Sequence, residues 1–457
     1  MPRLSHRFHH FPAYPLAHVP QRKRELLLRG VDVIDLGAGD ADLAPPAAAV
    51  AALQRAAETP ALGRYGFGLG HVPFREAIVA WMERRFGTRF DPMAEVVPLI
   101  GSKEGLAHVA FAYLGAGDVA IVPEPAYQAY LGGTLMSDAQ PFVYPLRPRT
   151  NFLVELEELP VDVVNRARVV YLNYPNNPTT AVAPLDYLER TIALCRRYGI
   201  VLAYDNAYCD LTFDDYRAPS IFDVPGARDV AIEFFSLSKS FSMTGWRVGF
   251  AVGNATLISG LTKVKSYTDT GPFLAIQRAG VVALDRAEAL AAPIRDELAR
   301  RRDAGVAALA AAGFAVDSPR AAMYLWVPLP AGLPSDRFTR FALETEGWDV
   351  RFIGADTPYA TVVESIRRTK PDLLCVSFTS SAPDKALRRG FASVARAVRS
   401  TGGKFLAGGF FAANFTTKEL SCDHVASSVT DGIAWVRDAF SLRSGPPKKA
   451  VQQAAAR

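Results

Sequence analysis

The segment SLSKSFSMTGWRVGF, residues 236–250, combines a lysine, small hydroxyl residues and an arginine within a short stretch. Lysine amines form Schiff bases with carbonyl compounds, and burial beside cationic neighbours lowers the amine pKa enough to make it nucleophilic. Arg247 follows Lys239 and offers a planar fork of donors that suits phosphate oxygens. The segment therefore predicts a site that holds a phosphorylated aldehyde on Lys239, although the same residue types would also suit a solvated serine-rich loop.

The chain around this segment alternates short apolar runs with longer amphipathic stretches. Apolar residues at i, i+3 and i+4 predict helices, for example over 73–86 and 184–199. The runs that predict buried strands are 31–39, 95–101, 118–125, 167–175, 199–208 and 230–239. Such alternation predicts an α/β fold with a mainly parallel sheet. Functional residues gather at the carboxyl ends of parallel strands, and the polar clusters of this chain follow its apolar runs.

Five motifs in a fixed order resemble those of the fold-type I aminotransferases, which depend on pyridoxal 5′-phosphate (PLP). The motifs are GSKEGLAH (101–108), PEPAYQAY (123–130), NYPNNPT (173–179), YDNAY (204–208) and SLSKSFSMTGWRVG (236–249). The resemblance covers residues 14–346 and is closest to the branch of LL-diaminopimelate and alanine aminotransferases. It implies a PLP-binding large domain over about residues 48–285, small-domain parts at either end of 1–347, and exchange of an amino group between an L-amino acid and a 2-oxo acid.

The resemblance also implies roles for particular residues. Lys239 would carry PLP as a Schiff base and then move a proton between the substrate α-carbon and the cofactor. Asp205 would pair with the pyridine nitrogen, and a cationic partner makes physical sense because an isolated buried carboxylate is costly. Gly39 would let the substrate approach the backbone closely. The other implied cofactor contacts are Tyr208 and Asn177 at the phenolic oxygen, Tyr127 on the ring face, and Ser102, Lys103, Ser236, Ser238 and Arg247 at the phosphate.

One further residue implies a partner. Tyr65, in RYGFGLG, matches a family tyrosine that reaches the phosphate of the neighbouring subunit. The resemblance therefore implies that the working unit is a homodimer.

Two features depart from the family pattern. Thr180 stands where the family usually has the glycine that follows NNPT, so local backbone strain or a shifted turn is expected. The family also has a C-terminal arginine that binds the substrate carboxylate in a bidentate pair, and Cys375 or Val376 falls in its place. The arginines that could replace it are Arg351, Arg367 and Arg368.

Residues 348–440 instead resemble the later part of cobalamin-binding domains. The motifs are GWDVRFIGADTP (347–358), PDLLCVSFT (371–379) and KFLAGGFF (404–411). The positions that match the slot for the nucleotide tail of cobalamin are Ser377, Thr379, Gly408 and Gly409. The DxHxxG loop with its cobalt-binding histidine is not found, since His424 has an unrelated setting, so the sequence does not predict cobalamin binding. The alternative is a flavodoxin-like α/β layer that only packs, followed by a flexible tail over 441–457.

Composition excludes several other classes of function. The net charge of +5 arises from scattered basic residues, which does not favour nucleic-acid binding. Four cysteines show neither metal-ligand nor disulfide spacing, which predicts no metal site and favours a reducing cytoplasm. No apolar run reaches the roughly 18 residues of a membrane span, and no signal peptide is recognisable.

Three functions stay open from the sequence. The first is a PLP-dependent aminotransferase. The second is a PLP-binding hybrid with weak or no transaminase activity, a cofactor sensor or a relic, which the missing arginine and the cobalamin-like segment suggest. The third is another PLP chemistry on the same scaffold, such as elimination or decarboxylation.

Overall fold

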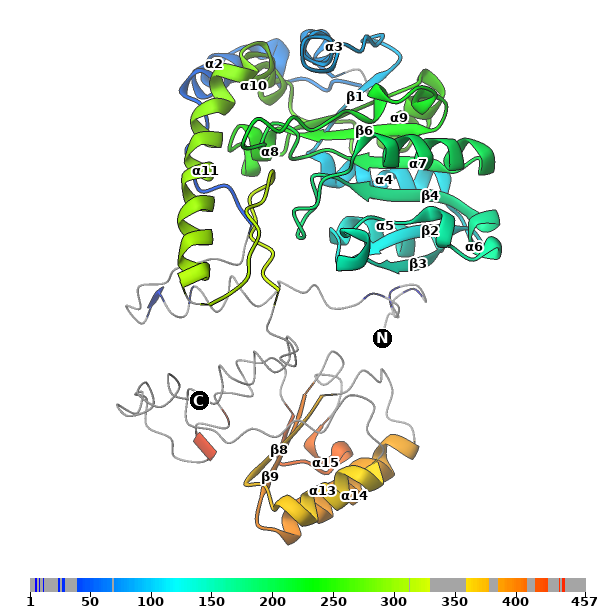
Figure 1. Cartoon of the computed structure of the whole chain (residues 1–457), viewed down its shortest axis with the longest axis vertical. Helices are drawn as coiled ribbons and strands as arrows, with labels where there is room; N and C mark the ends of the chain where they lie inside the picture. The colour runs from blue at the N-terminus through cyan, green and yellow to red at the C-terminus, as the bar shows by residue number, and fades with distance from the viewer. Residues whose placement is uncertain are drawn as a thin grey trace. The chain divides into compact units, whose positions relative to one another are not determined.

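A computed structural model of the 457-residue chain is shown in Figure 1. The structure describes residues 39–328 except 68, 69 and 312, then 359–377, 385–408 and 416–425, and a few isolated positions elsewhere. The chain divides into two compact units, Gly39–Pro328 and a second made of Met1–Ala38 and Leu329–Arg457. Most of the strand predicted over 31–39, the segment 348–358 and the tail over 441–457 lie outside the described residues.

A seven-stranded sheet forms the centre of the first unit. Its order is β1-β7-β6-β5-β4-β2-β3, with β7 antiparallel to both neighbours and every other adjacent pair parallel. The strands are β1 (Val96–Leu99), β2 (Val119–Glu124), β3 (Gln140–Pro145), β4 (Ala167–Asn173), β5 (Val201–Asp205), β6 (Ala231–Ser236) and β7 (Gly249–Gly253). The predicted α/β fold with a mainly parallel sheet is confirmed, whereas β3 and β7 lie outside the runs predicted as strands.

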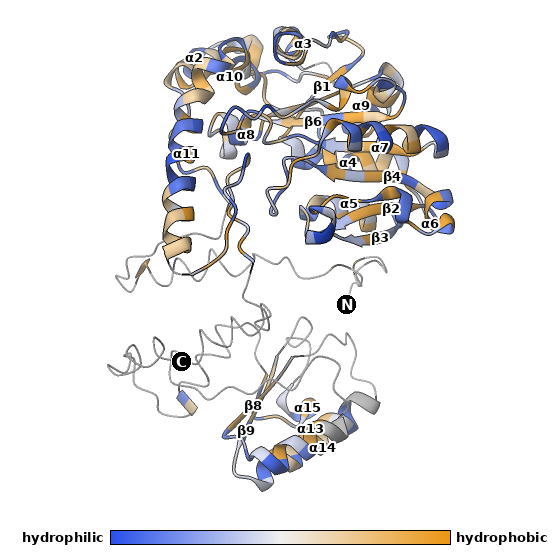
Figure 2. Ribbon diagram, viewed as in Figure 1, coloured by the Kyte–Doolittle hydropathy of each residue, from blue (hydrophilic) through white to orange (hydrophobic). Residues whose placement is uncertain are grey.

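Helices cover both faces of this sheet, because successive side chains of a strand point to opposite faces. Tyr171 packs with α4, α5 and α9, and its neighbour Leu172 packs with α7 on the other face. Hydrophobic residues predominate in the central strands, and the covering helices carry both hydrophobic and hydrophilic residues (Figure 2). The helices are α2 (Ala47–Ala57), α3 (Val72–Phe86), α4 (Ser102–Tyr113), α5 (Gln128–Met136), α6 (Val161–Arg166), α7 (Leu185–Tyr198), α8 (Leu237–Ser240), α9 (Ala255–Thr268), α10 (Leu274–Asp285) and α11 (Ala287–Ala311).

Helix α7 shows how the sequence fixes one of these elements. Leu188, Ile192 and Cys195 are spaced by three or four residues, and all three are buried on the sheet-facing side. The helix ends at Tyr198 and is capped by Gly199, whose φ of 66° lies in the left-handed region that glycine adopts at little cost. Helix α7 therefore matches the helix predicted over 184–199.

The second unit contains a three-stranded parallel sheet in the order β10-β9-β8. Its elements are α13 (Tyr359–Thr369), β8 (Leu373–Ser377), α14 (Lys385–Ser400), β9 (Lys404–Gly408), α15 (Thr417–Leu420) and β10 (His424–Val425). Phe391 of α14 and Phe405 of β9 pack in its core. The described strands and helices agree with the predicted flavodoxin-like segment, in which Ser377 and Gly408 are paired in register. The resemblance to cobalamin-binding domains stays a prediction.

Among the described residues, no helix is both long enough and apolar enough to span a membrane.

Candidate active site

The strands of the first unit bring the sequence-predicted site residues to one edge of the sheet. Strands β2, β4, β5 and β6 are parallel, and β1 runs in their direction because β7 is antiparallel to both β1 and β6. The carboxyl ends of these strands therefore share one edge with the start of β7. The predicted residues that end or follow these strands are Ser102, Lys103, Tyr127, Asn177, Asp205, Tyr208, Ser236, Ser238 and Lys239, and Arg247 precedes β7.

Lys239 lies in the short helix α8, directly after β6. Its Nζ donates a hydrogen bond of 2.7 Å to the carbonyl oxygen of Gly39, so these two predicted residues meet. Burial lowers the pKa of Lys239 and the charge of Arg247 lowers it further, although Asp40 acts in the opposite direction. A partly buried amine with a lowered pKa is the form of lysine that attacks a carbonyl group.

Asp205 ends β5 and is almost completely buried, with 4% of its surface exposed. The hydroxyl of Tyr130 donates to its Oδ2 at 2.7 Å, and the Asn173 side chain donates to its backbone oxygen at 2.8 Å. Burial raises the pKa of Asp205 to about 6 despite the hydrogen bond from Tyr130. Its Oδ1 is buried and has no hydrogen-bond partner among the described residues. The site therefore presents one carboxylate oxygen that a cationic donor could satisfy.

Tyr208 is joined to a residue that the sequence did not predict. Its hydroxyl lies 2.7 Å from the hydroxyl of Tyr324, and the two rings meet edge to face. Burial raises the pKa of Tyr208 well above its usual value, so its hydroxyl keeps its proton and can donate it. The ring of Tyr324 also lies against Gly39, where a Cβ would stand only 2.9 Å from Cε1. Tyr324 thus limits position 39 to glycine, whose φ there is +54°.

Tyr127 and Asn177 border the same edge. Tyr127 precedes α5, and its ring centroid lies 6.0 Å from that of Tyr130 and 5.7 Å from the Lys103 amine. Asn177 donates its backbone N–H to the side-chain oxygen of Asn173 at 2.7 Å. Since Asn173 pairs in register with Asp205, the loop that carries Asn177 is fixed to the strand next to Asp205.

A cradle for an anion forms between α4 and the start of β7. Ser102 and Lys103 begin α4, whose free N–H groups and dipole favour negative charge. Arg247 donates to the carbonyl oxygens of Ile100 at 3.3 Å and Thr244 at 3.1 Å, which holds its guanidinium beside this helix end. A Cβ on Gly249 would lie 3.0 Å from the Ser102 nitrogen and 2.5 Å from a carbonyl oxygen, so only glycine permits this approach.

The two remaining serines lie at the junction of β6 and α8. Ser236 caps α8 by accepting the backbone N–H of Ser238 at 3.2 Å. The hydroxyl of Ser238 is buried and has no hydrogen-bond partner among the described residues. Together with the free Oδ1 of Asp205, this hydroxyl fits a ligand that carries both a cationic ring nitrogen and a phosphate, and PLP is such a ligand.

Tyr65 differs from the other predicted residues. Its side chain is 74% exposed, and its ring packs against that of Phe67, which is 81% exposed. Within the described part of the chain, no hydrogen bond or ring contact joins Tyr65 to the edge that carries Lys239.

Thr180 adopts the strained conformation that the sequence predicts. Its φ is +62°, in the left-handed region that a β-branched residue avoids. Its N–H donates to the Asn176 carbonyl oxygen at 3.0 Å, and the Asn176 N–H donates to the Ala181 carbonyl oxygen at 2.9 Å. The turn that leads away from Asn177 therefore stays closed around an unfavourable backbone angle.

We expect Thr180→Gly to stabilise the protein by roughly 0.5–1 kcal/mol, because relief of left-handed strain exceeds the added chain entropy of glycine. Thermal unfolding should show a rise of about 1–3 °C in Tm. Thr179→Gly is the matched control, since the buried Thr179 hydroxyl donates to the Asn176 side chain at 2.7 Å and its loss should lower Tm. A fall in Tm for both variants would show that Thr180 is not strained.

Comparisons with known proteins agree with this geometry. Residues 31–350 match the family described as aminotransferase class I and II. LL-diaminopimelate aminotransferase 2 of Trichormus variabilis is 40% identical over 346 residues, which are 76% of this chain and 89% of that protein. LL-diaminopimelate aminotransferase of Nitratidesulfovibrio vulgaris is 42% identical over 346 residues, which are again 76% of this chain and 89% of that protein.

Solved structures give the same result. BacF from Bacillus subtilis superposes with a TM-score of 0.71 at 30% identity, covering 76% of this chain and 88% of that one. A probable N-succinyldiaminopimelate aminotransferase from Thermus thermophilus has a TM-score of 0.64 at 38% identity, covering 69% of this chain and 84% of that one. The chain therefore belongs to the aminotransferase class I and II family and is an aminotransferase of the kind that uses pyridoxal phosphate.

Proposed function

We propose that the protein moves an amino group between LL-diaminopimelate and a 2-oxo acid, with PLP attached covalently to Lys239. The substrate part rests on the relatives named LL-diaminopimelate aminotransferase, which are 40–42% identical to this chain over about three quarters of its length. The cofactor part rests on one observation above the others, the buried Oδ1 of Asp205 that lacks a partner among the described residues. An unpaired buried carboxylate is costly, so this position favours a ligand with a protonated ring nitrogen.

Lys239 and Asp205 have complementary tasks in this proposal. When bound, PLP supplies an aldehyde that takes up the substrate amine and a ring that accepts electron density from the α-carbon. Asp205 would hold the proton of the ring nitrogen in place. The Lys239 amine, once free of the cofactor, would take the proton from the substrate α-carbon and return it nearby. Its lowered pKa favours the neutral amine that this transfer needs.

The other site residues would bind and orient. Tyr208 can donate its hydroxyl proton to the phenolic oxygen of the cofactor, with Asn177 as a second donor, and Tyr127 can lie on the ring face. Gly39 leaves room for the substrate because a side chain there would collide with Tyr324. The phosphate would be held by Ser102, Lys103, Ser236, Ser238 and Arg247.

A homodimer is part of the proposal. Tyr65 and Phe67 expose most of their side chains, which is unusual for two adjacent large aromatic residues in contact with each other. Large exposed aromatic groups are typical of interfaces between proteins. Tyr65 would therefore reach the phosphate bound by a second copy of the chain.

The test of the substrate is a half-reaction on the purified, PLP-loaded protein. LL-diaminopimelate, meso-diaminopimelate, L-alanine, L-aspartate and L-glutamate are mixed with it separately, without a 2-oxo acid, and the cofactor absorbance is followed by stopped flow. We expect LL-diaminopimelate to convert the cofactor to its amine form at least about tenfold faster than the others at equal concentration, a difference of about 1.4 kcal/mol in the barrier.

Each other outcome has a distinct meaning. Fast conversion by a different amino acid would contradict the proposed substrate but keep the aminotransferase. Bound PLP with no conversion by any of the five would favour the sensor or relic suggested by the missing arginine. Release of ammonia or carbon dioxide, measured in the same mixtures, would favour elimination or decarboxylation.

A further inference from the structure

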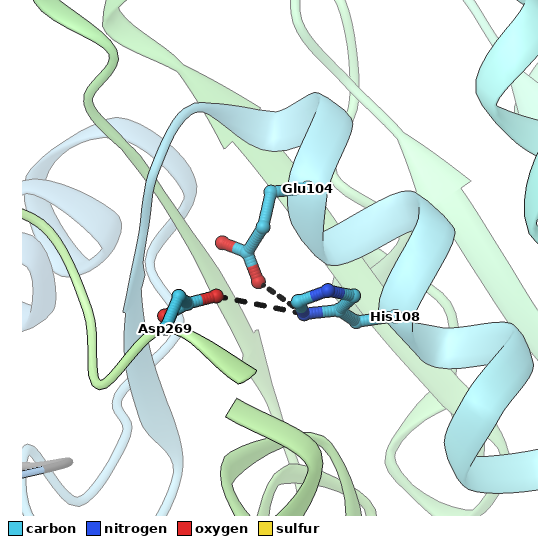
Figure 3. Close-up of side chains that lie close together, drawn as sticks. All are labelled: Glu104, His108 and Asp269. Carbon is cyan, nitrogen blue, oxygen red and sulfur yellow. Dashed lines mark ion pairs between the residues drawn. The ribbon is translucent and has the colours of Figure 1, made fainter. Parts of the chain in front are cut away.

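A group of charged side chains lies beside the first turns of α4, outside the residues assigned to the cofactor. It consists of Glu104, His108, Lys265 and Asp269, and we call it the Glu104 cluster. Glu104 and His108 point from α4 toward Asp269, which follows α9 (Figure 3). Lys265 is only 2% exposed, and its Nζ lies 2.8 Å from Glu104 Oε2 and 2.9 Å from Asp269 Oδ1. The ammonium therefore bridges two carboxylates in the interior.

The cluster is arranged as a network of ion pairs around Lys265. His108 Nδ1 lies 2.6 Å from Glu104 Oε1 as an ion-pair contact, although neither atom has a hydrogen-bond partner among the described residues. The ammonium of Lys265 already occupies the position where a cation would neutralise the two carboxylates.

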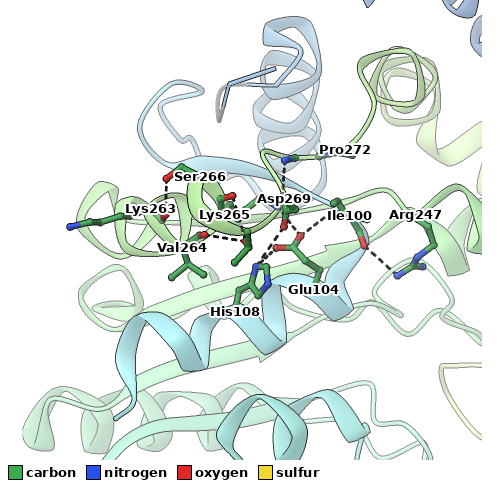
Figure 4. Close-up of polar contacts among 12 residues, drawn as sticks. Ile100, Glu104, His108, Arg247, Lys263, Val264, Lys265, Ser266, Asp269 and Pro272 are labelled. Atoms are coloured by element: carbon green, nitrogen blue, oxygen red, sulfur yellow. Dashed lines mark hydrogen bonds and ion pairs between the residues drawn. The ribbon is translucent and has the colours of Figure 1, made fainter. Parts of the chain in front are cut away.

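The cluster is connected to the turn that begins α4. Glu104 Oε2, which accepts from Lys265, also accepts the backbone N–H of Ile100 at 3.0 Å. The carbonyl oxygen of the same Ile100 accepts from Arg247 Nη2 at 3.3 Å, on the opposite side of the chain from Glu104 (Figure 4). Both backbone polar groups of Ile100 are thus engaged. Its N–H bonds to Glu104 of the cluster, and its carbonyl oxygen bonds to Arg247, the proposed phosphate-binding arginine.

The turn between Ile100 and α4 is closely packed against Arg247. Gly101, between Ile100 and the helix, has φ of +74°, and a Cβ on it would lie 2.6 Å from Arg247 Nη2. A shift of Ile100 would therefore move both the free N–H groups of α4 and the guanidinium packed against Gly101. Burial alone would raise the pKa of Glu104, but the neighbouring His108 and Lys265 outweigh it and lower the pKa. Glu104 thus stays ionised, and a charged acceptor makes a stronger bond to Ile100.

We infer that Glu104, held by Lys265, is a positioning residue that sets the phosphate-binding turn and the place of Arg247. Glu104 does not touch the ligand. It acts through Ile100, so its removal should weaken recognition of the phosphate and leave recognition of the aldehyde and ring nearly unchanged. This inference rests on the proposed function, because it takes the ligand of the turn to be the phosphate of PLP.

The experiment compares PLP with pyridoxal, which has the same ring and aldehyde but no phosphate. Dissociation constants of both compounds are measured by absorbance titration of the cofactor-free protein, for the wild type, Glu104→Ala and Glu104→Gln. We expect Glu104→Ala to weaken PLP binding about tenfold or more and pyridoxal binding less than about twofold. Glu104→Gln should lie between, because its amide oxygen can still accept from Ile100 but does not attract Lys265 as a charge would.

Glu95→Ala is the matched control. Glu95 is 17% exposed against 14% for Glu104, accepts a backbone N–H from Asp91 at 2.8 Å and pairs with Arg228 at 2.6 Å, but precedes β1 at the far end of that strand. The Glu95→Ala variant should keep the wild-type ratio of the dissociation constants for PLP and pyridoxal, even if its Tm falls.

An unchanged ratio in the Glu104 variants would overturn the inference, whether both affinities fell together or neither changed. If Glu104→Ala does not fold, the ratio in Glu104→Gln decides in the same way. Failure of the wild type to attach PLP to Lys239, seen by borohydride reduction and peptide mass, would instead overturn the proposed function.

Discussion

Replacing Lys239 with alanine is expected to lower transamination by about 1,000-fold or more and to abolish covalent attachment of PLP. The variant loses the amine that is proposed both to attach the cofactor and to carry the α-proton. Rates are measured with LL-diaminopimelate and 2-oxoglutarate. Attachment is measured by borohydride reduction followed by peptide mass spectrometry.

Two lysines make this experiment specific. Lys103 lies at the same edge, and burial and then Arg247 lower its pKa as well, so it is the alternative site of attachment. Lys263 is exposed on α9, and Lys263→Ala should leave rate and labelling unchanged. Label on Lys103, or a Lys239→Ala rate within about tenfold of the wild type, would contradict the assignment of Lys239.

The sequence predicted the edge of the sheet well because its signals are local. Lys239 and Asp205 each follow a run of apolar residues, and the carboxyl ends of parallel strands must share an edge. The strand β7 was not predicted, since GFAVG is short and contains two glycines, which weaken strand preference. Its antiparallel direction depends on pairing with β1 and β6, and this pairing is not a local property.

The contacts that refine the site could not be predicted, because they join distant parts of the chain. Tyr324 meets Tyr208 across 116 residues, and Lys265 meets Glu104 across 161. The pair Glu104 and His108 is visible in GSKEGLAH at helical spacing, but an i, i+4 pair is more often a solvated surface feature. Only the fold shows that Lys265 pairs with Glu104 in the interior, and that Glu104 is bonded to Ile100 in the proposed phosphate-binding turn.

Asp205→Asn is expected to lower turnover by about 100- to 1,000-fold, because a neutral amide cannot stabilise a protonated ring nitrogen. It should also weaken PLP binding in a pH-dependent way. The pKa of Asp205 is about 6 without the cofactor, so the wild-type carboxyl is neutral below this pH and charged above it. The ratio of wild-type to variant affinity should therefore rise from pH 5 to pH 7 and then level off.

Although Asp205→Asn should weaken turnover and PLP binding, it should stabilise the fold of the protein without cofactor. A carboxyl whose folded pKa is raised from 3.8 to about 6 contributes stability that is present below pH 3.8 and is lost as the pH rises to about 6. At pH 7, Asp205→Asn should therefore raise the unfolding free energy of the cofactor-free protein by up to about 3 kcal/mol. In the PLP-loaded protein, the lost pairing with the ring nitrogen should reverse this gain.

Asp210→Asn is the control, because the partly buried Asp210 is paired with Arg85 at 3.2 Å within the protein itself. Losing that pair should leave PLP affinity unchanged. The decisive comparison is thus the sign of the Tm change in the cofactor-free protein. A lower Tm for Asp205→Asn would mean that the carboxylate is already satisfied by the chain, and its free Oδ1 would no longer support a cationic ligand.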